Sequence, residues 1–154
     1  MRKGIKICLL LLCMLTIFFF SHDSGMTSTK KSNQVILGVS NFFSTTELSL
    51  EQKEKLMSYL IVPVRKSAHF IIYLILGILI ISNFKEYFYL KRSFIFLSIA
   101  LAFLYACSDE VHQLFISGRS GQFSDVLLDT VGAGVGCFLY YFVYKKKEAN
   151  VTHE

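Results

Sequence analysis

The chain lacks the short motifs that mark zinc proteins, disulfide-rich proteins and several enzyme classes. Its four cysteines each lie inside an apolar run, and no CxxC or mixed His/Cys spacing occurs. We therefore expect free thiols, and neither disulfides nor a structural zinc site. There is no HExxH and no recognised nucleophile motif, and the glycines near residue 134 do not follow the GxGxxG spacing of a dinucleotide site. We predict no bound metal and no cofactor.

A long run of like charge is also absent. The formal net charge is +5, but no block of five like charges occurs, and the basic residues flank apolar runs instead. Blocks of like charge are typical of arms that bind nucleic acid, whereas basic residues at the ends of apolar runs are typical of membrane proteins. We therefore expect membrane lipids, and no nucleic acid, as partners.

Apolar residues, by contrast, are abundant and clustered. They make up 53% of the 154 residues, and they fall in four blocks. The share exceeds that of a usual soluble domain, and such blocks are typical of membrane spans. The pattern predicts an all-α, polytopic membrane protein, a bundle of about four transmembrane helices in a single domain over residues 1–154. The expected spans are approximately 5–21, 67–84, 93–109 and 125–144, with outer loops at 22–66 and 110–124.

The first apolar run has two interpretations. A basic start, an apolar middle and a polar end are shared by signal peptides and transmembrane helices. No Ala-x-Ala cleavage pattern follows, and Phe18, Phe19 and Phe20 stand where a cleavage site needs small residues. We favour a retained first transmembrane helix over a cleaved signal peptide.

The loop after this span divides into two parts. Its first part is rich in Ser, Thr and Lys, which is typical of a flexible surface segment. In the second part, Ser49 followed by Gln52 is a capping-box pattern that predicts a helix start, and Pro63 predicts the end of that helix. The resulting short amphipathic helix would lie either on the membrane surface or in the solvent as an ordinary loop helix.

One face of the second span carries its only ionisable residue. His69, Tyr73 and Gly77 recur at steps of four and therefore share one face of the expected helix. A single histidine one turn inside a span is typical of a structural hydrogen bond to a neighbouring helix. A structural role of His69 is therefore an open alternative to a functional one.

The third span ends in a group of polar residues. Tyr105, Asp109 and then His112 or Gln113 recur at helical spacing. If the helix continues through Gln113, then Asp109, His112 and Gln113 project on one side and Glu110 lies about a quarter turn round. Because ionisable groups in a membrane are costly, their concentration here indicates a functional or a paired structural site.

The fourth span carries a narrow stripe of aspartates and glycines. Asp125, Asp129, Gly132 and Gly136 follow one another at steps of four, three and four. The GxxxG spacing lets another helix approach closely, so both aspartates are expected to face a partner helix, and it would also permit a homo-oligomer. Asp125 has an alternative role in the first helical turn, where a carboxylate interacts favourably with the helix dipole.

The basic residues also predict the orientation of the chain. Four spans place both termini on one side of the membrane. The connector 85–92 carries Lys85, Lys91 and Arg92, whereas the loop 109–124 carries only Arg119. Since basic residues concentrate in cytoplasmic loops, we expect a multi-pass protein with both termini in the cytoplasm. The polar residues described above then lie together at the outer surface.

A set of polar residues and glycines recurs in order along most of the chain. It consists of Lys66-x-x-His69-x-x-x-Tyr73, Tyr105-x-x-x-Asp109-Glu110-x-His112-Gln113-x-Phe115, Gly118-Arg119 and Asp125-x-x-x-Asp129-x-x-Gly132-x-x-x-Gly136. This set resembles the VanZ-like family. Ser117 stands where the family often has Pro, and Asp129 where many members have Asn. The resemblance implies a small polytopic protein of the bacterial plasma membrane, and the founding member is associated with resistance to the glycopeptide teicoplanin.

The first functional hypothesis is a binding module. Arg119 offers a planar fork suited to phosphate or carboxylate, in a loop whose glycines let a ligand approach the backbone. An anionic lipid headgroup, an envelope precursor or a lipophilic glycopeptide at the outer leaflet would fit. Alternatively, Arg119 pairs with Asp109, Glu110 or Asp125 and locks the loop. The expected ligand-binding residues are Arg119, Lys66, His69, Tyr73, Asp109, Glu110, Gln113, Asp125 and Asp129.

The second hypothesis is a membrane-embedded enzyme, a hydrolase or transferase acting on an envelope lipid. Its candidate catalytic residues would supply a general acid and base or hold a divalent metal; they are Asp109, Glu110, His112 and His69. Transport is the third hypothesis. Four spans are few for a carrier unless the chain forms a homo-oligomer through Gly132 and Gly136.

Overall fold

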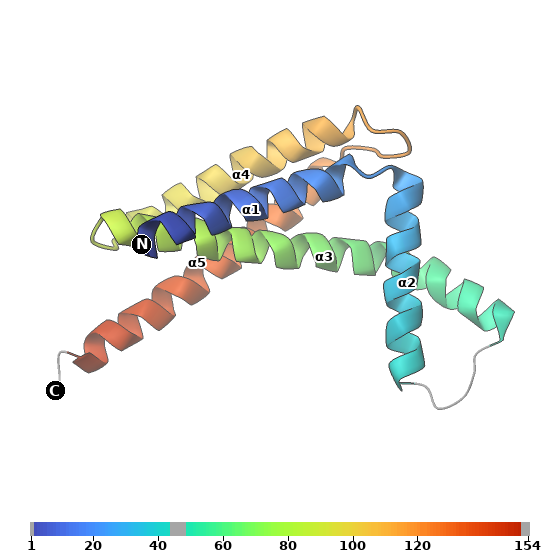
Figure 1. The fold of residues 1–154 in the computed structure, drawn as a ribbon, viewed down its shortest axis with the longest axis horizontal. Coiled ribbons are helices and arrows are strands. Elements are labelled where there is room, and N and C mark those ends of the chain that lie inside the picture. The colour runs from blue at the N-terminus through green and yellow to red at the C-terminus, as the bar shows by residue number, and fades with distance from the viewer. Residues whose placement is uncertain (1, 44–48, 152–154) are drawn as a thin grey trace.

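Helices make up nearly all of the structure. The computed structural model describes residues 2–43 and 49–151. In chain order the helices are α1 (Arg2–His22), α2 (Gly25–Phe43), α3 (Leu50–Tyr87), α4 (Ser93–Gln113) and α5 (Phe123–Val151), as Figure 1 shows. No strand occurs within the described residues. The predicted all-α fold class is therefore confirmed.

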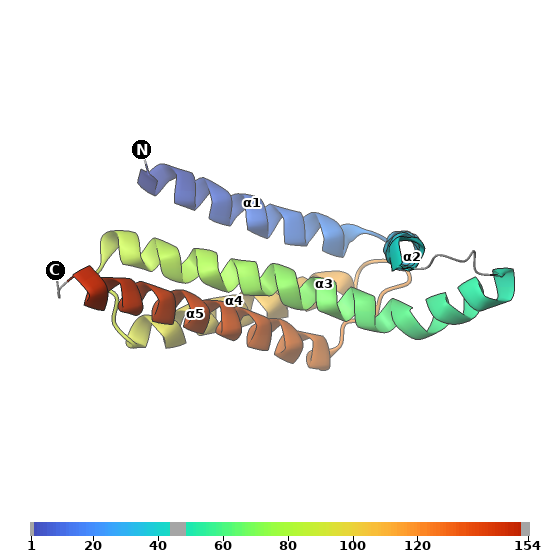
Figure 2. The same cartoon turned by 90° about the horizontal axis from the view of Figure 1, so that it is seen from below.

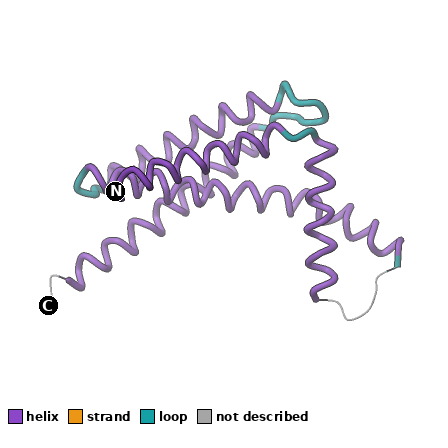
Figure 3. Tube along the Cα trace, in the orientation of Figure 1, coloured by secondary structure: helices purple, strands orange, loops and turns teal. Residues whose placement is uncertain are grey.

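Four helices, α1, α3, α4 and α5, are long and apolar enough to cross a membrane. α3 is the central element, because it contacts each of the other four helices. α1 begins and α5 ends at one end of the bundle, and the loops 23–24 and 114–122 lie at the opposite end (Figures 1 and 3). We call this opposite end the loop end.

Large apolar side chains remain exposed along the four spans. Examples are Leu12 and Phe19 on α1, Leu104 on α4 and Phe142 on α5. A soluble domain rarely leaves so many large apolar side chains in water, whereas a membrane protein turns them to lipid. The prediction of a polytopic membrane bundle is therefore confirmed by both helix length and surface chemistry.

The segment after α1 differs from the prediction. We expected the first part of the loop 22–66 to be a flexible surface segment, but Gly25–Phe43 forms the 19-residue helix α2. This helix lies across the loop end of the bundle (Figure 1). The Ser24 hydroxyl caps this helix by accepting a hydrogen bond from the Thr27 amide at 3.3 Å. Ser32 and Ile36, one turn apart, are buried. The polar first half of this helix and its narrow buried face explain why hydropathy alone did not reveal it.

α3 confirms one sequence prediction and corrects another. Its start has the predicted capping box. The backbone amide of Gln52 donates to Ser49 Oγ at 3.3 Å, and the backbone amide of Ser49 donates to Gln52 Oε1 at 2.9 Å. The prediction that Pro63 ends the helix was wrong, because Pro63 lies inside α3, which is 38 residues long. The helix changes direction along its length instead (Figure 2). Proline removes one hydrogen bond and bends a helix, but the helix can continue beyond the bend.

α3 and α5 pack with their backbones in close contact. A Cβ added at Gly132 would lie 2.6 Å from the Phe70 carbonyl oxygen, and one added at Gly136 would lie 2.1 Å from that of Leu74. On α3, Gly77 faces the α5 backbone in the same way. The glycine stripe therefore contacts a partner helix, as its spacing predicted, and that partner is α3 of the same chain.

Candidate functional site

The ionisable residues singled out in the sequence collect at the loop end of the bundle. They come from the middle of α3, the C-terminal end of α4, the start of α5 and the loop 114–122. Asp109, Glu110 and Asp129 are each less than a tenth exposed. Burial of three carboxylates in a membrane bundle requires partners that compensate for lost hydration.

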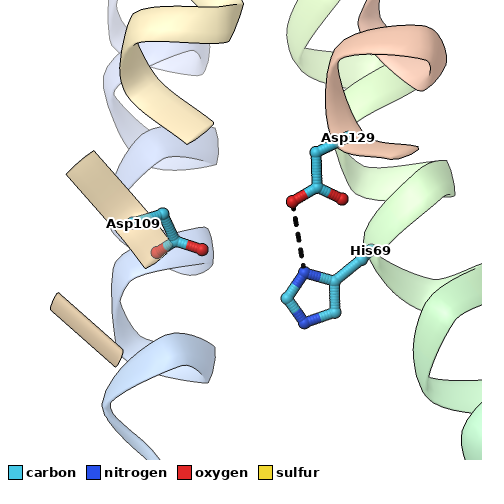
Figure 4. Close-up of side chains that lie close together, drawn as sticks. All are labelled: His69, Asp109 and Asp129. Carbon is cyan, nitrogen blue, oxygen red and sulfur yellow. Dashed lines mark ion pairs between the residues drawn. The ribbon is translucent and has the colours of Figure 1, made fainter. Parts of the chain in front are cut away.

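Three of these residues form a compact group, which we call the His-Asp-Asp group: His69 of α3, Asp109 of α4 and Asp129 of α5 (Figure 4). One potential ligand atom from each residue lies within 4.8 Å of the others. His69 Nδ1 is 3.6 Å from Asp129 Oδ2, an ion-pair distance that is too long for a hydrogen bond. Asp109 approaches this pair from the other side (Figure 4).

Several polar atoms in this region lack a hydrogen-bond partner among the described residues. They are both carboxylate oxygens of Asp129, Nδ1 of His69, the Tyr73 hydroxyl and Oε1 of Glu110. Asp129 and Tyr73 are each 0% exposed. Buried polar atoms in folded proteins are nearly always satisfied, so such a concentration indicates a place where a ligand or ion completes the bonding.

Asp109 is held in place by its neighbours. The Gln113 amide nitrogen lies 3.2 Å from Asp109 Oδ2 and donates to the Ser21 hydroxyl at 2.8 Å. The Gln113 amide oxygen in turn accepts a hydrogen bond from Arg119 at 3.2 Å. A chain of polar contacts therefore connects the loop arginine to the buried carboxylate.

Arg119 attaches the loop 114–122 to the C-terminal end of α1. Its Nε donates to the carbonyl of Asp23 at 2.8 Å, and a terminal nitrogen donates to that of Phe20 at 2.7 Å. Among the ion pairs of the described residues none includes Arg119, so the expected alternative of a carboxylate partner is not what locks the loop. Gly118 takes a φ of 73°, a left-handed conformation that suits glycine, and it turns the chain into Arg119.

A cavity of about 270 Å³ opens between α1, α2, α3 and Arg119. Its polar lining includes Asp23, Lys31, Arg65, His69 and Arg119, and the remainder is mostly apolar: Ile17, Phe20, Val35, Val64, Ala68 and Ile72. Burial lowers the pKa of Arg119, and the positive charge of Arg65 lowers it further, but an arginine remains a cation at neutral pH. The cavity thus combines positive charge with an apolar wall.

Arg65 is the functional candidate that the sequence analysis missed. It lines the cavity, and no hydrogen bond or ion pair of its guanidinium is found within residues 2–43 and 49–151. The available signal was an arginine directly before the expected span that contains His69.

The other predicted site residues lie in separate contacts. Lys66 forms an ion pair with Asp125, which also lies in the first turn of α5. Glu110 accepts a hydrogen bond from the backbone amide of Gln122 at 2.8 Å. The His112 side chain contacts α1, where its Nε2 is 3.3 Å from Nδ1 of His22. The His-Asp-Asp group thus contains three of the predicted residues, and His112 belongs to a different contact.

A second, larger cavity of about 610 Å³ lies between α1, α3 and α4 and extends toward the end of the bundle opposite the loop end. Its lining is almost wholly apolar and includes Leu10, Leu76, Ile80 and Leu104. Such a groove on a membrane protein suits a hydrocarbon chain, but it contributes no charged group.

Four membrane-length helices, with a half-buried histidine and two buried aspartates at one end of the bundle, define this chain as a polytopic helical membrane protein with a polar site. The sequence profile of the VanZ/LLP1 family matches residues 6–144, and the chain belongs to that family. Comparison with curated proteins and with solved structures gave no significant match.

Proposed function

We propose that this VanZ-family protein binds an anionic amphiphile of the bacterial cell envelope in the cavity at the loop end. The observation that carries the proposal is the presence of Arg65 and Arg119 in a cavity with an apolar wall. Guanidinium groups bind phosphate and carboxylate through paired N–H donors, and an apolar wall accommodates a hydrocarbon tail. An anionic lipid, a lipid-linked envelope precursor and a lipophilic glycopeptide share this chemistry.

The proposal includes a location in the bacterial plasma membrane. Lys85, Lys91 and Arg92 at the opposite end of the bundle support, by the positive-inside rule, cytoplasmic termini and a cavity at the outer leaflet. There, binding of teicoplanin or of the envelope precursor that it recognises would lower susceptibility to teicoplanin-type glycopeptides. A cysteine at Ser120, in the loop end, should react with a membrane-impermeant maleimide in intact cells, whereas labelling only after lysis would reverse the orientation.

Native mass spectrometry of the purified full chain tests the binding. We expect an anionic lipid to stay bound to the wild-type protein and to be largely lost from Arg65→Ala. This variant is the sharper probe, because no bond of Arg65 that holds the fold is found among the described residues. Arg92→Ala, an arginine at the opposite end of the bundle, is the matched control and should keep its lipid. Equal lipid retention in wild type and Arg65→Ala would contradict the proposal.

The glycopeptide is tested separately. Purified protein in nanodiscs is titrated with teicoplanin, and the minimal inhibitory concentration of teicoplanin is measured for a susceptible bacterium that expresses each variant. We expect Arg65→Ala to lose both the binding and any gain in resistance, and Arg92→Ala to keep them. Lipid binding without teicoplanin binding or altered susceptibility would restrict the function to the lipid.

A membrane-embedded enzyme is the second candidate function. The observation that favours it is that His69 both lines the cavity and lies 3.6 Å from Asp129, so a bound amphiphile would meet a candidate acid–base group. An enzyme predicts that Asp109→Asn keeps the bound lipid but abolishes its conversion. Mass spectra of the extracted lipid, before and after incubation with the wild-type protein, would show a changed mass only if catalysis occurs.

A further inference from the structure

We propose that His69, Asp109 and Asp129 together bind one divalent transition-metal ion, Zn²⁺ or Mn²⁺. The site would have three protein ligands from three helices and an open coordination position toward the cavity. This inference goes beyond the proposed function, since it concerns metal binding by the protein itself and requires no lipid, glycopeptide or reaction.

The geometry of the His-Asp-Asp group is close to that of a metal site. One donor atom from each residue lies within 4.8 Å of the others, and His69 Nδ1 and Asp129 Oδ2 are 3.6 Å apart. Bonds of about 2.0–2.2 Å to zinc bring two ligand atoms to about 3–4 Å from each other. The group therefore needs a closure of about 1 Å at its widest pair, which rotation of an aspartate side chain can supply.

The bonding of Asp129 is an independent indication of a missing cation. Its side chain is 0% exposed, and neither of its oxygens has a hydrogen-bond partner among the described residues. Nδ1 of His69, which points at this carboxylate, is likewise without a hydrogen-bond partner there. A buried carboxylate with no donor is costly. A dication between Asp109 and Asp129 would use their oxygens and offset the charge of both.

The types of ligand favour zinc or manganese over other ions. Neutral imidazole nitrogen suits zinc and other transition metals, and carboxylate oxygen suits manganese, whereas calcium and magnesium prefer all-oxygen sites. No cysteine belongs to the group. Three protein ligands with one open position is the arrangement of catalytic rather than structural zinc sites.

The residues around the group would orient its ligands. Gln113 contacts Asp109 through its amide nitrogen and is itself held by Arg119 and Ser21. Metal-binding carboxylates typically have such outer partners, which fix their direction. His69 also lines the cavity that contains Arg65 and Arg119. The open position would therefore face a space that admits water and a phosphate or carboxylate group.

The alternative to a metal site is a metal-free state of the same three residues. Protonated His69 would pair with Asp129, and Asp109 would carry a proton. The two states make different predictions for metal content, and Asp129→Asn distinguishes them well because its carboxylate oxygens make no hydrogen bond that the fold would lose among the described residues.

The test is metal analysis of the full-length protein purified in detergent. The protein is loaded with zinc chloride or manganese chloride, desalted and measured by inductively coupled plasma mass spectrometry, with a Co²⁺ absorption titration to report ligand number. We expect about one ion per chain in the wild-type protein. His69→Ala and Asp129→Asn should each weaken binding more than tenfold, with the elution volume of the folded protein unchanged.

His22→Ala is the matched control. His22 lies at the same end of the bundle and faces His112 at 3.3 Å, so this histidine pair is the competing place for surface-bound zinc. The variant should keep wild-type metal content. Less than about a tenth of an ion per chain in the folded wild-type protein, or loss of the ion from His22→Ala with retention in Asp129→Asn, would overturn the proposal.

Discussion

Lys66 on α3 forms an ion pair with Asp125 on α5, one helical turn before the contact between His69 and Asp129 on the same two helices. Farther along, Phe70 and Leu74 meet Gly132 and Gly136. The two helices thus run in the same direction, with charged contacts at the loop end and backbone contacts in the membrane. The stripe that brings the helices together also positions Asp129 in the candidate site.

The first prediction concerns the glycine contacts. Gly136→Ala should lower the free energy of unfolding by about 1–3 kcal/mol, the usual cost of overpacking. The reason is that the added Cβ would lie 2.1 Å from the Leu74 carbonyl oxygen, which a rigid helix backbone cannot move away. Thermal unfolding of the protein in detergent, followed by circular dichroism, measures the effect.

Gly38→Ala on α2 is the control for this experiment. No atom lies within 4 Å of a Cβ built there, and alanine has the higher helix propensity. This variant should be as stable as the wild type or slightly more so. If Gly136→Ala proved as stable as Gly38→Ala, the close packing of α3 on α5 would be wrong.

The second prediction concerns the Lys66–Asp125 pair. A double-mutant cycle with Lys66→Ala and Asp125→Asn should give a coupling energy of about 0.2–1 kcal/mol, the range of exposed ion pairs. The Lys66 side chain is 35% exposed and that of Asp125 15%, so solvent screens the pair only in part. Repeating the cycle in 0.5 M salt should lower the coupling. A coupling of several kcal/mol that salt leaves unchanged would mean that the pair is buried.

The third prediction concerns Arg119 as a structural residue. Arg119→Ala should destabilise the attachment of the loop 114–122 by about 1.5–3 kcal/mol, because charged donors to the carbonyls of Phe20 and Asp23 are lost. Arg119→Lys should recover only part of this, since one ammonium cannot reproduce the spread of guanidinium donors. Limited proteolysis should cut the 114–122 loop faster in both variants. Wild-type cleavage rates in Arg119→Ala would contradict the locking role.

The fourth prediction concerns the continuity of α3. Because the helix passes through Pro63, Pro63→Ala should leave the fold intact and raise stability, by up to about 3 kcal/mol if the bend has no role in packing. Hydrogen exchange of residues 56–66 should be slow in the wild type and slower in the variant. Fast exchange of this segment in the wild type would show instead that α3 begins after Pro63.

The sequence predicted most of the fold because its signals are local. Apolar runs of membrane length predicted the four spans, and Ser49 with Gln52 predicted the start of α3. The two errors have physical reasons. The first half of α2 is polar, so its helix depends on contacts with α3 that a local pattern does not contain. Pro63 removes one hydrogen bond, but a helix can bend at a proline and continue.

The candidate site was predictable in part. Helical spacing placed Asp125 and Asp129 on the glycine face of one helix, and His69 on the Tyr73 and Gly77 face of another. Spacing within a helix fixes which side chains share a face, but it does not fix the rotation and depth of one helix against the next. For that reason the sequence suggested His112 as a companion of Asp109, whereas the structure turns His112 to His22.

The sequence by itself determined the class of protein, the family to which it belongs and the concentration of polar residues at one end of the bundle, because hydropathy, charge and helical period are properties of short segments. Only the tertiary structure decided that His69, Asp109 and Asp129 converge, that Arg65 joins Arg119 in a cavity, and that Gly132 and Gly136 contact α3. Each of these relations joins residues far apart in the chain, and the packing of one helix on another brings them together.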